Sequence, residues 1–259
     1  MSALEHFYSG MEWNPRPLHG VDLKMWCYLV GAVGLCLNVL SAMALHLQVQ
    51  GDTGPSRAAV AYLIMIMWFA TEYMWFERVH LYTYDLFRER LGFKIVWGCF
   101  CFYPFFYCVG VWPLVDPAGY TNGDISQQAA RLIVALYAGG WVLTRGANLQ
   151  KYALKRGRKT FLGMQLITVP GSNGRLLCSG WWGISRHVNY LGEIVQGIAL
   201  ALPGWLATGS LVPWLYPAYY LVLFIPRQLD DDVVCAAKYG EAWARYTALV
   251  KYRIMPYVW

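Results

Sequence analysis

Six apolar stretches, each long enough or almost long enough to cross a lipid bilayer, follow one another along this 259-residue chain. A helix needs about 20 predominantly apolar residues to span the hydrocarbon core. The stretches cover residues 25–48, 58–76, 92–115, 128–145, 190–208 and 210–226. Hydrophobic residues make up 58% of the sequence, more than soluble domains usually carry, which favours a bilayer over one large soluble core. We therefore predict an all-α fold, a polytopic helical membrane protein with about six membrane segments.

Proline and glycine interrupt three of these stretches. Pro104, Gly139–Gly140 and Pro203–Gly204 are each expected to kink or break a membrane helix. Only a short loop separates segment 190–208 from segment 210–226. These two segments are therefore expected to form a helical hairpin.

The chain becomes polar after Pro226, and residues 228–250 have the spacing of an amphipathic helix. We expect this helix to lie in the cytoplasm or on the membrane surface. Four side chains recur along one of its faces and could hold ribose hydroxyls or a carboxamide: Asp231, Cys235, Tyr239 and Tyr246. The alternative is that they only pack the helix against the membrane region.

Basic residues are concentrated in the second half of the chain. Residues 1–144 carry 8 Lys and Arg against 10 Asp and Glu, whereas residues 145–259 carry 13 against 5. Eight basic residues and no acidic one lie between Arg145 and His187. By the positive-inside rule this loop and the C-terminal residues lie in the cytoplasm. Anionic headgroups or a phosphate-bearing cofactor would each explain the basic patch.

The beginning of the chain and its cysteines exclude several classes of protein. Residues 1–16 lack the basic region and apolar core of a cleaved signal peptide, so the first spanning helix is expected to direct insertion. The seven cysteines lie mostly in apolar runs and form no C-x-x-C pair. We therefore expect neither a metal site nor a disulfide framework.

Basic side chains would have to hold any nucleotide, because the chain has no Rossmann or Walker pattern. The sequence from Gly171 to Gly174 is too short and does not lie between a strand and a helix. Lys151 and Lys155 are one helical turn apart at the end of an apolar segment. Side chains at this spacing share a face and could straddle a diphosphate.

The segment from Ser179 to Tyr190 combines aromatic, basic and amide side chains directly before an apolar stretch. The indole of Trp182 can stack on a planar heterocycle, Arg186 can fork onto a phosphate, and Asn189 can hydrogen-bond an amide. The alternative is an aromatic belt at the membrane interface with a snorkelling arginine.

Glu72 and Glu77 lie in or beside the second apolar stretch, and Asp85 and Glu89 follow it, one helical turn apart. An ionised carboxylate near hydrocarbon costs about 2.5 kcal/mol or more, so such groups tend to be paired, protonated or functional. Burial raises the pKa of a carboxyl group and would make it a possible proton donor. A structural ion-pair cluster with Arg78, Arg88 and Arg90 is the alternative.

Several motifs occur in an order that resembles the membrane sterol reductases, the family of the Δ14-, Δ7- and C24(28)-sterol reductases. The first half carries Gly10–Arg16 (GMEWNPR), Val21–Trp26 (VDLKMW), Glu77, Tyr84–Phe87 (YDLF) and Leu91–Phe93 (LGF). The second half carries Arg145–Lys151 (RGANLQK), Leu176–Gly183 (LLCSGWWG), Arg186–Tyr190 (RHVNY), Asp231, Cys235, Lys238–Gly240 (KYG), Trp243, Tyr246 and Tyr252–Tyr257 (YRIMPY). The resemblance covers essentially the whole chain.

The resemblance implies reduction of a sterol carbon–carbon double bond with NADPH as cofactor. It implies cofactor contacts at Lys151, Lys155, Leu177, Trp182, Asn189, Tyr190, Asp231, Cys235, Tyr239 and Tyr246. We add Arg186 from the basic loop, and we expect Asp85, Glu77 or Tyr84 to donate or relay the proton. Residues 1–144 would form the sterol side and residues 145–259 the NADPH-binding region.

The implied partners are a sterol and membrane lipids, without nucleic acid, in the endoplasmic reticulum membrane of a eukaryote or the inner membrane of a bacterium. A Δ14 bond is favoured, although Tyr84–Arg90 (YDLFRER) is closer to the C24(28) type. Two further classes stay open: an isoprenylcysteine-type methyltransferase that uses S-adenosylmethionine, and a catalytically silent sterol-binding protein.

Overall fold

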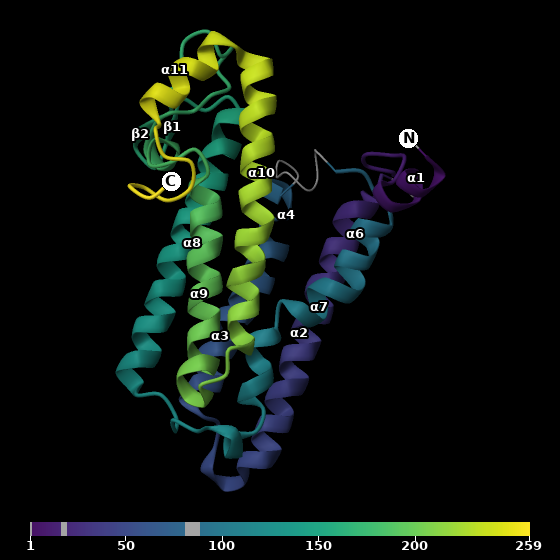
Figure 1. The fold of residues 1–259 in the computed structure, drawn as a ribbon, viewed down its shortest axis with the longest axis vertical. Helices are drawn as coiled ribbons and strands as arrows, with labels where there is room; N and C mark the ends of the chain where they lie inside the picture. The colour runs from purple at the N-terminus through teal and green to yellow at the C-terminus, as the bar shows by residue number, and fades with distance from the viewer. Residues whose placement is uncertain (1, 17–19, 81–88) are drawn as a thin grey trace. The chain divides into compact units, whose positions relative to one another are not determined.

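The computed structural model describes residues 2–16, 20–80 and 89–259, and the secondary structure of these residues is helical apart from one short hairpin (Figure 1). The α-helices are α1 (Ala3–Ser9), α2 (Leu23–Gln50), α3 (Arg57–Trp75), α4 (Glu77–His80), α6 (Phe93–Trp97), α7 (Tyr103–Phe106), α8 (Gln127–Lys155), α9 (Val188–Thr208), α10 (Leu215–Tyr239) and α11 (Glu241–Leu249). Strands β1 (Thr160–Phe161) and β2 (Met164–Gln165) pair antiparallel. The predicted all-α class is confirmed.

The chain forms two compact units. The first comprises Met1–Val134 with Leu200–Tyr216, and the second comprises Ala135–Ala199 with Pro217–Trp259. Three long helices, α8, α9 and α10, each contribute to both units. The predicted functional division after residue 144 lies within α8 and remains a prediction about function.

Four segments of the described residues are long and apolar enough to cross a membrane: Leu23–Thr53, Arg57–Trp75, Phe93–Leu114 and Val188–Thr208. They coincide with four of the six predicted stretches. Of the other two, 128–145 lies inside α8, and 210–226 includes the first half of α10; both helices also carry charged residues.

The third span is divided into several short helices, as we predicted from the position of Pro104. It consists of α6, a π-helical turn at Gly98–Phe102, α7 and a 3-10 helix at Val109–Leu114, with Pro104 in the first turn of α7. At the other two positions, where a kink or a break was predicted, no break occurs. Helix α8 continues through Gly139–Gly140, and α9 continues through Pro203–Gly204.

Gly140 of α8 and Gly192 of α9 let the two helices approach closely. This close approach explains Gly140 better than a break in the helix does. A Cβ atom at Gly192 would lie 2.2 Å from the Thr144 hydroxyl oxygen and 2.5 Å from the Gly140 carbonyl oxygen. A Cβ atom at Gly140 would lie 2.8 Å from the Gly192 carbonyl oxygen. Backbone on both sides therefore excludes any larger side chain at this crossing.

We expect Gly192→Ala to lower the free energy of unfolding by about 1–3 kcal/mol, because the added methyl group overpacks the crossing. Gly139→Ala is the matched control, since a Cβ atom there meets nothing within 4 Å. Alanine at that position should be neutral or stabilising, because glycine weakens a helix by roughly 1 kcal/mol. Thermal unfolding in detergent measures both changes. Equal midpoints for the two variants would contradict the close approach.

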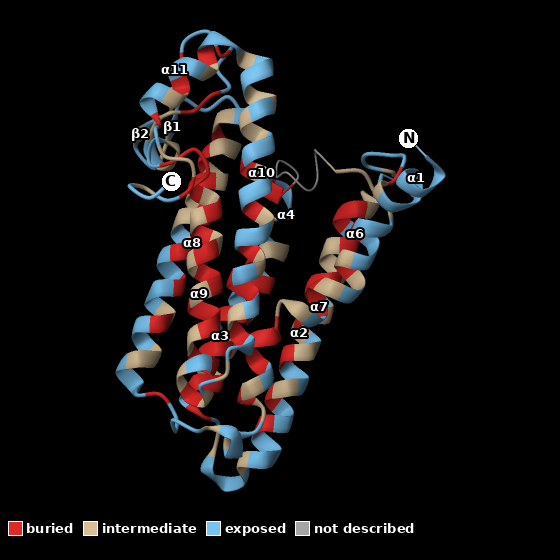
Figure 2. Ribbon diagram, viewed as in Figure 1, coloured by how far each residue is buried: buried red, intermediate tan, exposed pale blue. Residues whose placement is uncertain are grey.

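In the first unit, α2 packs against α3 and against the divided third span, with buried residues on the facing sides (Figure 2). A Cβ atom at Gly31 of α2 would lie 2.4 Å from the Cys99 carbonyl oxygen. The Asn38 amide donates to the Pro104 carbonyl at 3.0 Å. The fully buried His46 contacts the Leu114 carbonyl through Nδ1 at 2.8 Å. These contacts fix the third span beside α2.

In the second unit, α8, α9 and α10 lie side by side (Figure 1). The Tyr220 hydroxyl of α10 donates to Glu193 of α9 at 3.1 Å. The rings of Tyr190 and Phe224 stack between the same helices, with centroids 4.3 Å apart. Helices α9 and α10 therefore form the predicted hairpin.

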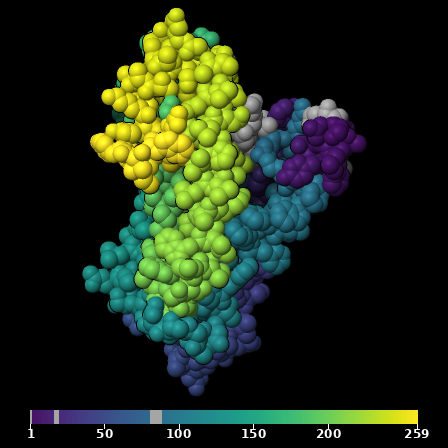
Figure 3. Space-filling model, viewed as in Figure 1, coloured from purple at the N-terminus to yellow at the C-terminus, as the bar shows by residue number. Residues whose placement is uncertain are grey.

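The predicted amphipathic helix at residues 228–250 is divided into two helices. Helix α10 continues through Pro226 to Tyr239, and Gly240 then adopts a φ of 51°, a left-handed value that favours glycine. Helix α11 follows, and with the residues after it gathers at one end of α10 (Figure 3). Tyr246 therefore belongs to α11 and not to the α10 face that carries Asp231.

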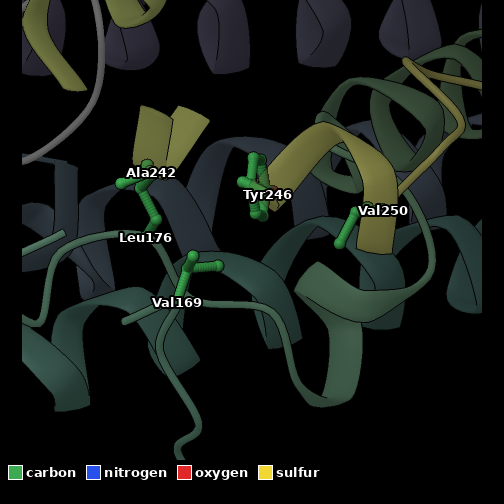
Figure 4. Packing of buried hydrophobic residues seen from close by; sticks show 5 residues of the cluster. All are labelled: Val169, Leu176, Ala242, Tyr246 and Val250. Carbon is green, nitrogen blue, oxygen red and sulfur yellow. The ribbon is translucent and has the colours of Figure 1, made fainter. Parts of the chain in front are cut away.

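Helix α11 packs on the loop that follows the β-hairpin. Five buried residues form the contact, as Figure 4 shows: Val169, Leu176, Ala242, Tyr246 and Val250. Cys178, Tyr239 and Trp243 pack against this cluster. The loop and α11 thus form a small apolar core beside the ends of the long helices.

Candidate functional site

Three lysines gather where α8 and α10 meet in the second unit. The Lys151 ammonium lies 5.2 Å from the centre of the Trp182 ring. Burial lowers the pKa of Lys151, while the nearby Asp231 and Cys235 of α10 oppose that shift. Partial burial, and then repulsion from Lys151 and Lys238, lower the pKa of Lys155 to about 8. Such a concentration of positive charge suits a bound anion.

Lys238 is the member of this group that the sequence interpretation missed. It lies on α10 two turns beyond Asp231, and its ammonium lies 5.2 Å from the centre of the Tyr239 ring. The heptad spacing from Asp231 to Lys238 is visible in the sequence and predicts a shared helix face. Only the packing of α10 against α8 shows that this face meets Lys155.

A 3-10 turn at Gly180–Gly183 holds Trp182 against α8. The Trp182 indole donates to the Ala147 carbonyl at 2.9 Å, and the Trp181 indole donates to the Val142 carbonyl at 3.1 Å. Gly180 has a φ of 59°, and a Cβ atom there would lie 2.3 Å from the Gln150 amide nitrogen. The turn therefore needs glycine, and it fixes the ring that Lys151 covers.

Arg186 is buried in an ion-pair network. Its Nη1 lies 3.5 Å from Asp232, and its guanidinium lies 5.9 Å from the centre of the Trp243 ring. Asp232 also accepts from the Gln228 amide at 2.6 Å and pairs with Arg253 at 3.2 Å. The sequence interpretation selected Asp231 but missed Asp232, its neighbour on the adjoining face of α10.

The first turn of α9 carries Asn189 and Tyr190. The Tyr190 ring stacks with the rings of His187 and Phe224, with centroids 4.9 Å and 4.3 Å apart. These neighbours restrict the approach of a ligand to the Tyr190 ring. Burial, followed by repulsion from Lys151 and Arg186, lowers the pKa of His187 to about 3. The imidazole is neutral at physiological pH.

Buried polar atoms without a hydrogen-bond partner are concentrated in this unit. Within the described residues they include both amide atoms of Gln150 and single atoms of Ser185, Arg186, His187, Asn189 and Gln228. Leaving a buried polar group unsatisfied costs about 1–3 kcal/mol, so native proteins contain few. A ligand rich in hydroxyl, amide and phosphate groups would satisfy them. The residues present therefore fit a dinucleotide.

The remaining predicted cofactor residues lie in or beside the apolar core. Leu177 is buried and its backbone pairs with Thr168. Tyr246 belongs to the cluster in Figure 4, and Tyr239 packs against it. Burial raises the pKa of the Tyr246 hydroxyl, and the positive charge of Arg186 partly opposes this shift. Tyr246 thus packs α11 and also lies near the ion-pair network.

Of the predicted proton donors, Glu77 is the one among the described residues, and it belongs to the first unit. Glu77 begins α4 and is exposed. Tyr84 and Asp85 lie outside the described residues. Glu72, near the end of α3, is the one buried carboxylate among the described residues of this unit.

The alternative ion-pair cluster in this region is only partly seen. The Glu89 carboxylate pairs with Lys94 at 2.8 Å, a partner that the sequence interpretation did not consider. The guanidinium of Arg90 lies 5.1 Å from the centre of the Trp13 ring. Arg88 lies outside the described residues.

Comparison with known proteins agrees with the motifs. The model of the "Ergosterol biosynthesis ERG4/ERG24 family" matches residues 2–259. A Delta(14)-sterol reductase of Arabidopsis thaliana is 35% identical over 258 residues, which cover 100% of this chain and 67% of the relative. The Delta(14)-sterol reductase TM7SF2 of Mus musculus is 33% identical and erg24 of Schizosaccharomyces pombe is 31% identical, and each alignment covers 100% of this chain.

The chain spans 60% of the mouse relative and 59% of the fission yeast relative, so it corresponds to about three fifths of their length. The similarity extends over both units, and it includes the second-unit residues that gather around Lys151. Because the family model matches nearly every residue, this membrane protein belongs to the ERG4/ERG24 family of ergosterol biosynthesis, a family of sterol reductases.

Proposed function

We propose that the protein reduces a carbon–carbon double bond of a sterol with NADPH as the electron donor. The observation that carries the proposal is the lysine group of the second unit beside buried polar atoms that lack partners. The similar Delta(14)-sterol reductases favour the Δ14 bond, with the Δ7 and C24(28) bonds as alternatives. Reduction consumes one NADPH and one proton for each double bond.

In this proposal the phosphates contact Lys151, Lys155 and Lys238. NADPH, when bound, supplies the hydride. Trp182, Asn189 and Tyr190 flank the nicotinamide half, while Leu177, Asp231, Cys235, Tyr239 and Tyr246 lie nearer the ribose and adenosine. Arg186 contributes its Nε–H, which is buried without an acceptor, while its Nη1 remains with Asp232.

The chain must also supply a proton to the sterol alkene. We retain Asp85 as the leading donor, because it matches the family motif, with Tyr84 and Glu77 as alternatives or relays. Glu72 is added because a buried carboxylate beside hydrocarbon tends to be functional. An acid in this segment would protonate the alkene carbon before or while hydride arrives.

Charge separates this proposal from the methyltransferase alternative. The sulfonium of S-adenosylmethionine is positive, and the lysines would repel it, whereas they attract the phosphates of NADPH. The family match also favours reductases. A catalytically silent sterol-binding protein would need no such site.

The direct test is NADPH oxidation by the purified protein in lipid nanodiscs with a Δ8,14-dienol sterol. We expect one NADPH to be consumed for each Δ14 bond reduced. Methyl transfer from labelled S-adenosylmethionine, without NADPH oxidation, would establish the methyltransferase alternative. Sterol binding without either reaction would establish the silent alternative.

We expect NADPH to bind about 10–100-fold more tightly than NADH. The extra 2′-phosphate gains charge-assisted hydrogen bonds worth about 1.5–3 kcal/mol. Equilibrium titration of each cofactor at fixed salt measures the ratio. Equal affinities would contradict a contact between the basic side chains of the second unit and the 2′-phosphate.

Cofactor affinity should fall as the pH rises through about 8, the pKa of Lys155. The Lys155 cation is present below that pH and is lost above it, and a bound phosphate favours the charged form. If only the charged form binds, the Kd for NADPH at pH 9 should be about tenfold that at pH 7.

Lys155→Arg is the matched control, because arginine stays charged throughout this range. The pKa of Lys151 is also lowered, but Lys151 is present in both proteins, so the difference between their pH profiles reports Lys155. Parallel profiles for the two proteins would contradict the assignment.

A further inference from the structure

Residues 252–259 form a closed hook in the second unit. The backbone N–H groups of Arg253 and Ile254 both donate to the Trp259 carbonyl, at 2.9 Å and 3.2 Å. The Arg253 guanidinium lies 5.6 Å from the centre of the Trp259 ring, and the Tyr252 and Tyr257 rings are 5.0 Å apart. Hydrogen bonds and ring contacts within residues 252–259 therefore hold the hook in a defined conformation.

This hook is hydrogen-bonded to the chain directly before α9. The Arg186 N–H donates to the Tyr252 carbonyl at 2.9 Å, and the His187 N–H donates to the Arg253 carbonyl at 2.9 Å. Val188 is the first residue of α9, so both bonds hold the approach to its first turn. The orientation of Asn189 and of the residues around it depends on that approach.

A carboxylate beneath the hook connects it to α10. The Asp232 carboxylate forms ion pairs with Arg253 Nε at 3.2 Å and with Arg186 Nη1 at 3.5 Å. It also accepts a hydrogen bond from the Gln228 amide at 2.6 Å. The side chains of Asp232 and Arg186 are 16% and 9% exposed, and that of Arg253 is 37% exposed. Ion pairs that are partly shielded from water are stronger than pairs on the open surface.

We propose that Arg253 and Asp232 are positioning residues for the cofactor. They hold residues 186–190 between the hook and α10, so that Asn189 and Tyr190 already have the orientation that NADPH binding requires. This inference rests on the proposed function. Neither residue contacts the cofactor, and both act through the start of α9. Loss of preorganisation weakens binding even when every contacting side chain is retained.

Arg253→Gln is the variant that tests the proposal, because it removes the charge and keeps most of the side-chain length. We expect its Kd for NADPH to rise about tenfold, the equivalent of losing about 1.4 kcal/mol. Arg253→Lys keeps the charge and should restore most of the affinity. Asp232→Asn should weaken binding at least as much as Arg253→Gln, because it also weakens the pairing with Arg186. The double variant should bind no more weakly than Asp232→Asn, because the contact between Arg253 and Asp232 is already lost there.

Arg57→Gln is the matched control. Arg57 Nε pairs with Asp124 Oδ2 at 3.1 Å in the first unit, which is the same atomic pairing at nearly the same distance as Arg253 with Asp232. It should leave the Kd for NADPH unchanged. Comparable losses of affinity for Arg57→Gln and Arg253→Gln would point to general destabilisation and overturn the inference.

Hydrogen–deuterium exchange supplies a readout that does not depend on the cofactor. The amides of Arg186 and His187 should exchange about tenfold faster in Arg253→Gln than in the wild type, because the hook that accepts from them loosens. Wild-type affinity in Arg253→Gln would overturn the inference and leave the proposed function standing. A wild-type protein that fails to bind NADPH would overturn both.

Discussion

Lys151→Ala is expected to weaken NADPH binding by about 30–100-fold. Lys151 lies at the centre of the lysine group, and the Trp182 ring and α10 shield its ammonium from water. A charge-assisted hydrogen bond to phosphate in such surroundings is worth about 1.5–3 kcal/mol, and about 1.4 kcal/mol corresponds to a factor of ten. Titration of the detergent-solubilised protein with NADPH measures the loss.

The matched control for this prediction is Lys251→Ala. Lys251 is exposed in the same unit, so its removal changes the net charge equally without touching the lysine group. We expect less than a twofold change in Kd, because solvent screens an exposed charge. If both substitutions weaken binding to the same extent, the attraction is a property of net charge and not of a built site.

Asp85→Asn is expected to lower kcat by about 100-fold or more while leaving the Kd for NADPH within about twofold. General acid catalysis contributes roughly a hundredfold to ten-thousandfold, and asparagine cannot donate the required proton. The phosphate contacts belong to other residues, so cofactor affinity should be retained. Single-turnover reduction of the sterol and equilibrium titration of NADPH separate the two quantities.

Glu72→Gln is the parallel experiment, because Glu72 is the buried carboxylate of α3. Asp52→Asn is the control, since Asp52 is exposed in the turn after α2. Loss of turnover in Glu72→Gln with wild-type turnover in Asp85→Asn would assign the proton to α3. Wild-type turnover in both variants would direct the search to Tyr84 and Glu77.

The sequence predicted most of the long helices closely. The apolar stretches 25–48, 58–76 and 190–208 match α2, α3 and α9 to within two residues at each end. Apolar length alone determines these helices, so no knowledge of their neighbours is needed. The predictions differ from the structure where contacts with a neighbouring helix determine the local conformation. Gly139–Gly140 suggested a break, but Gly140 instead makes room for the Gly192 backbone of α9.

The site was predictable to the extent that spacing along one helix defines it. The four-residue interval between Asp231 and Cys235 predicted that both lie on one helix face. In the structure both lie on α10 and influence the pKa of Lys151. Tyr246 was assigned to the same face, but Gly240 ends α10 before it. Tertiary partners such as Asp232 for Arg186 remained invisible, because two charges far apart in sequence carry no signal of their pairing.

Hydride transfer from NADPH to a sterol carbon is the central step of the proposed reaction. The most direct measurement is mass spectrometry of the sterol formed from a Δ8,14-dienol with NADPH that carries deuterium at both C4 positions of the nicotinamide. We predict that each reduced double bond carries one deuterium from the cofactor and one hydrogen from the solvent. A reduced sterol without cofactor deuterium, or no reduced sterol from a protein that binds both compounds, would contradict the account.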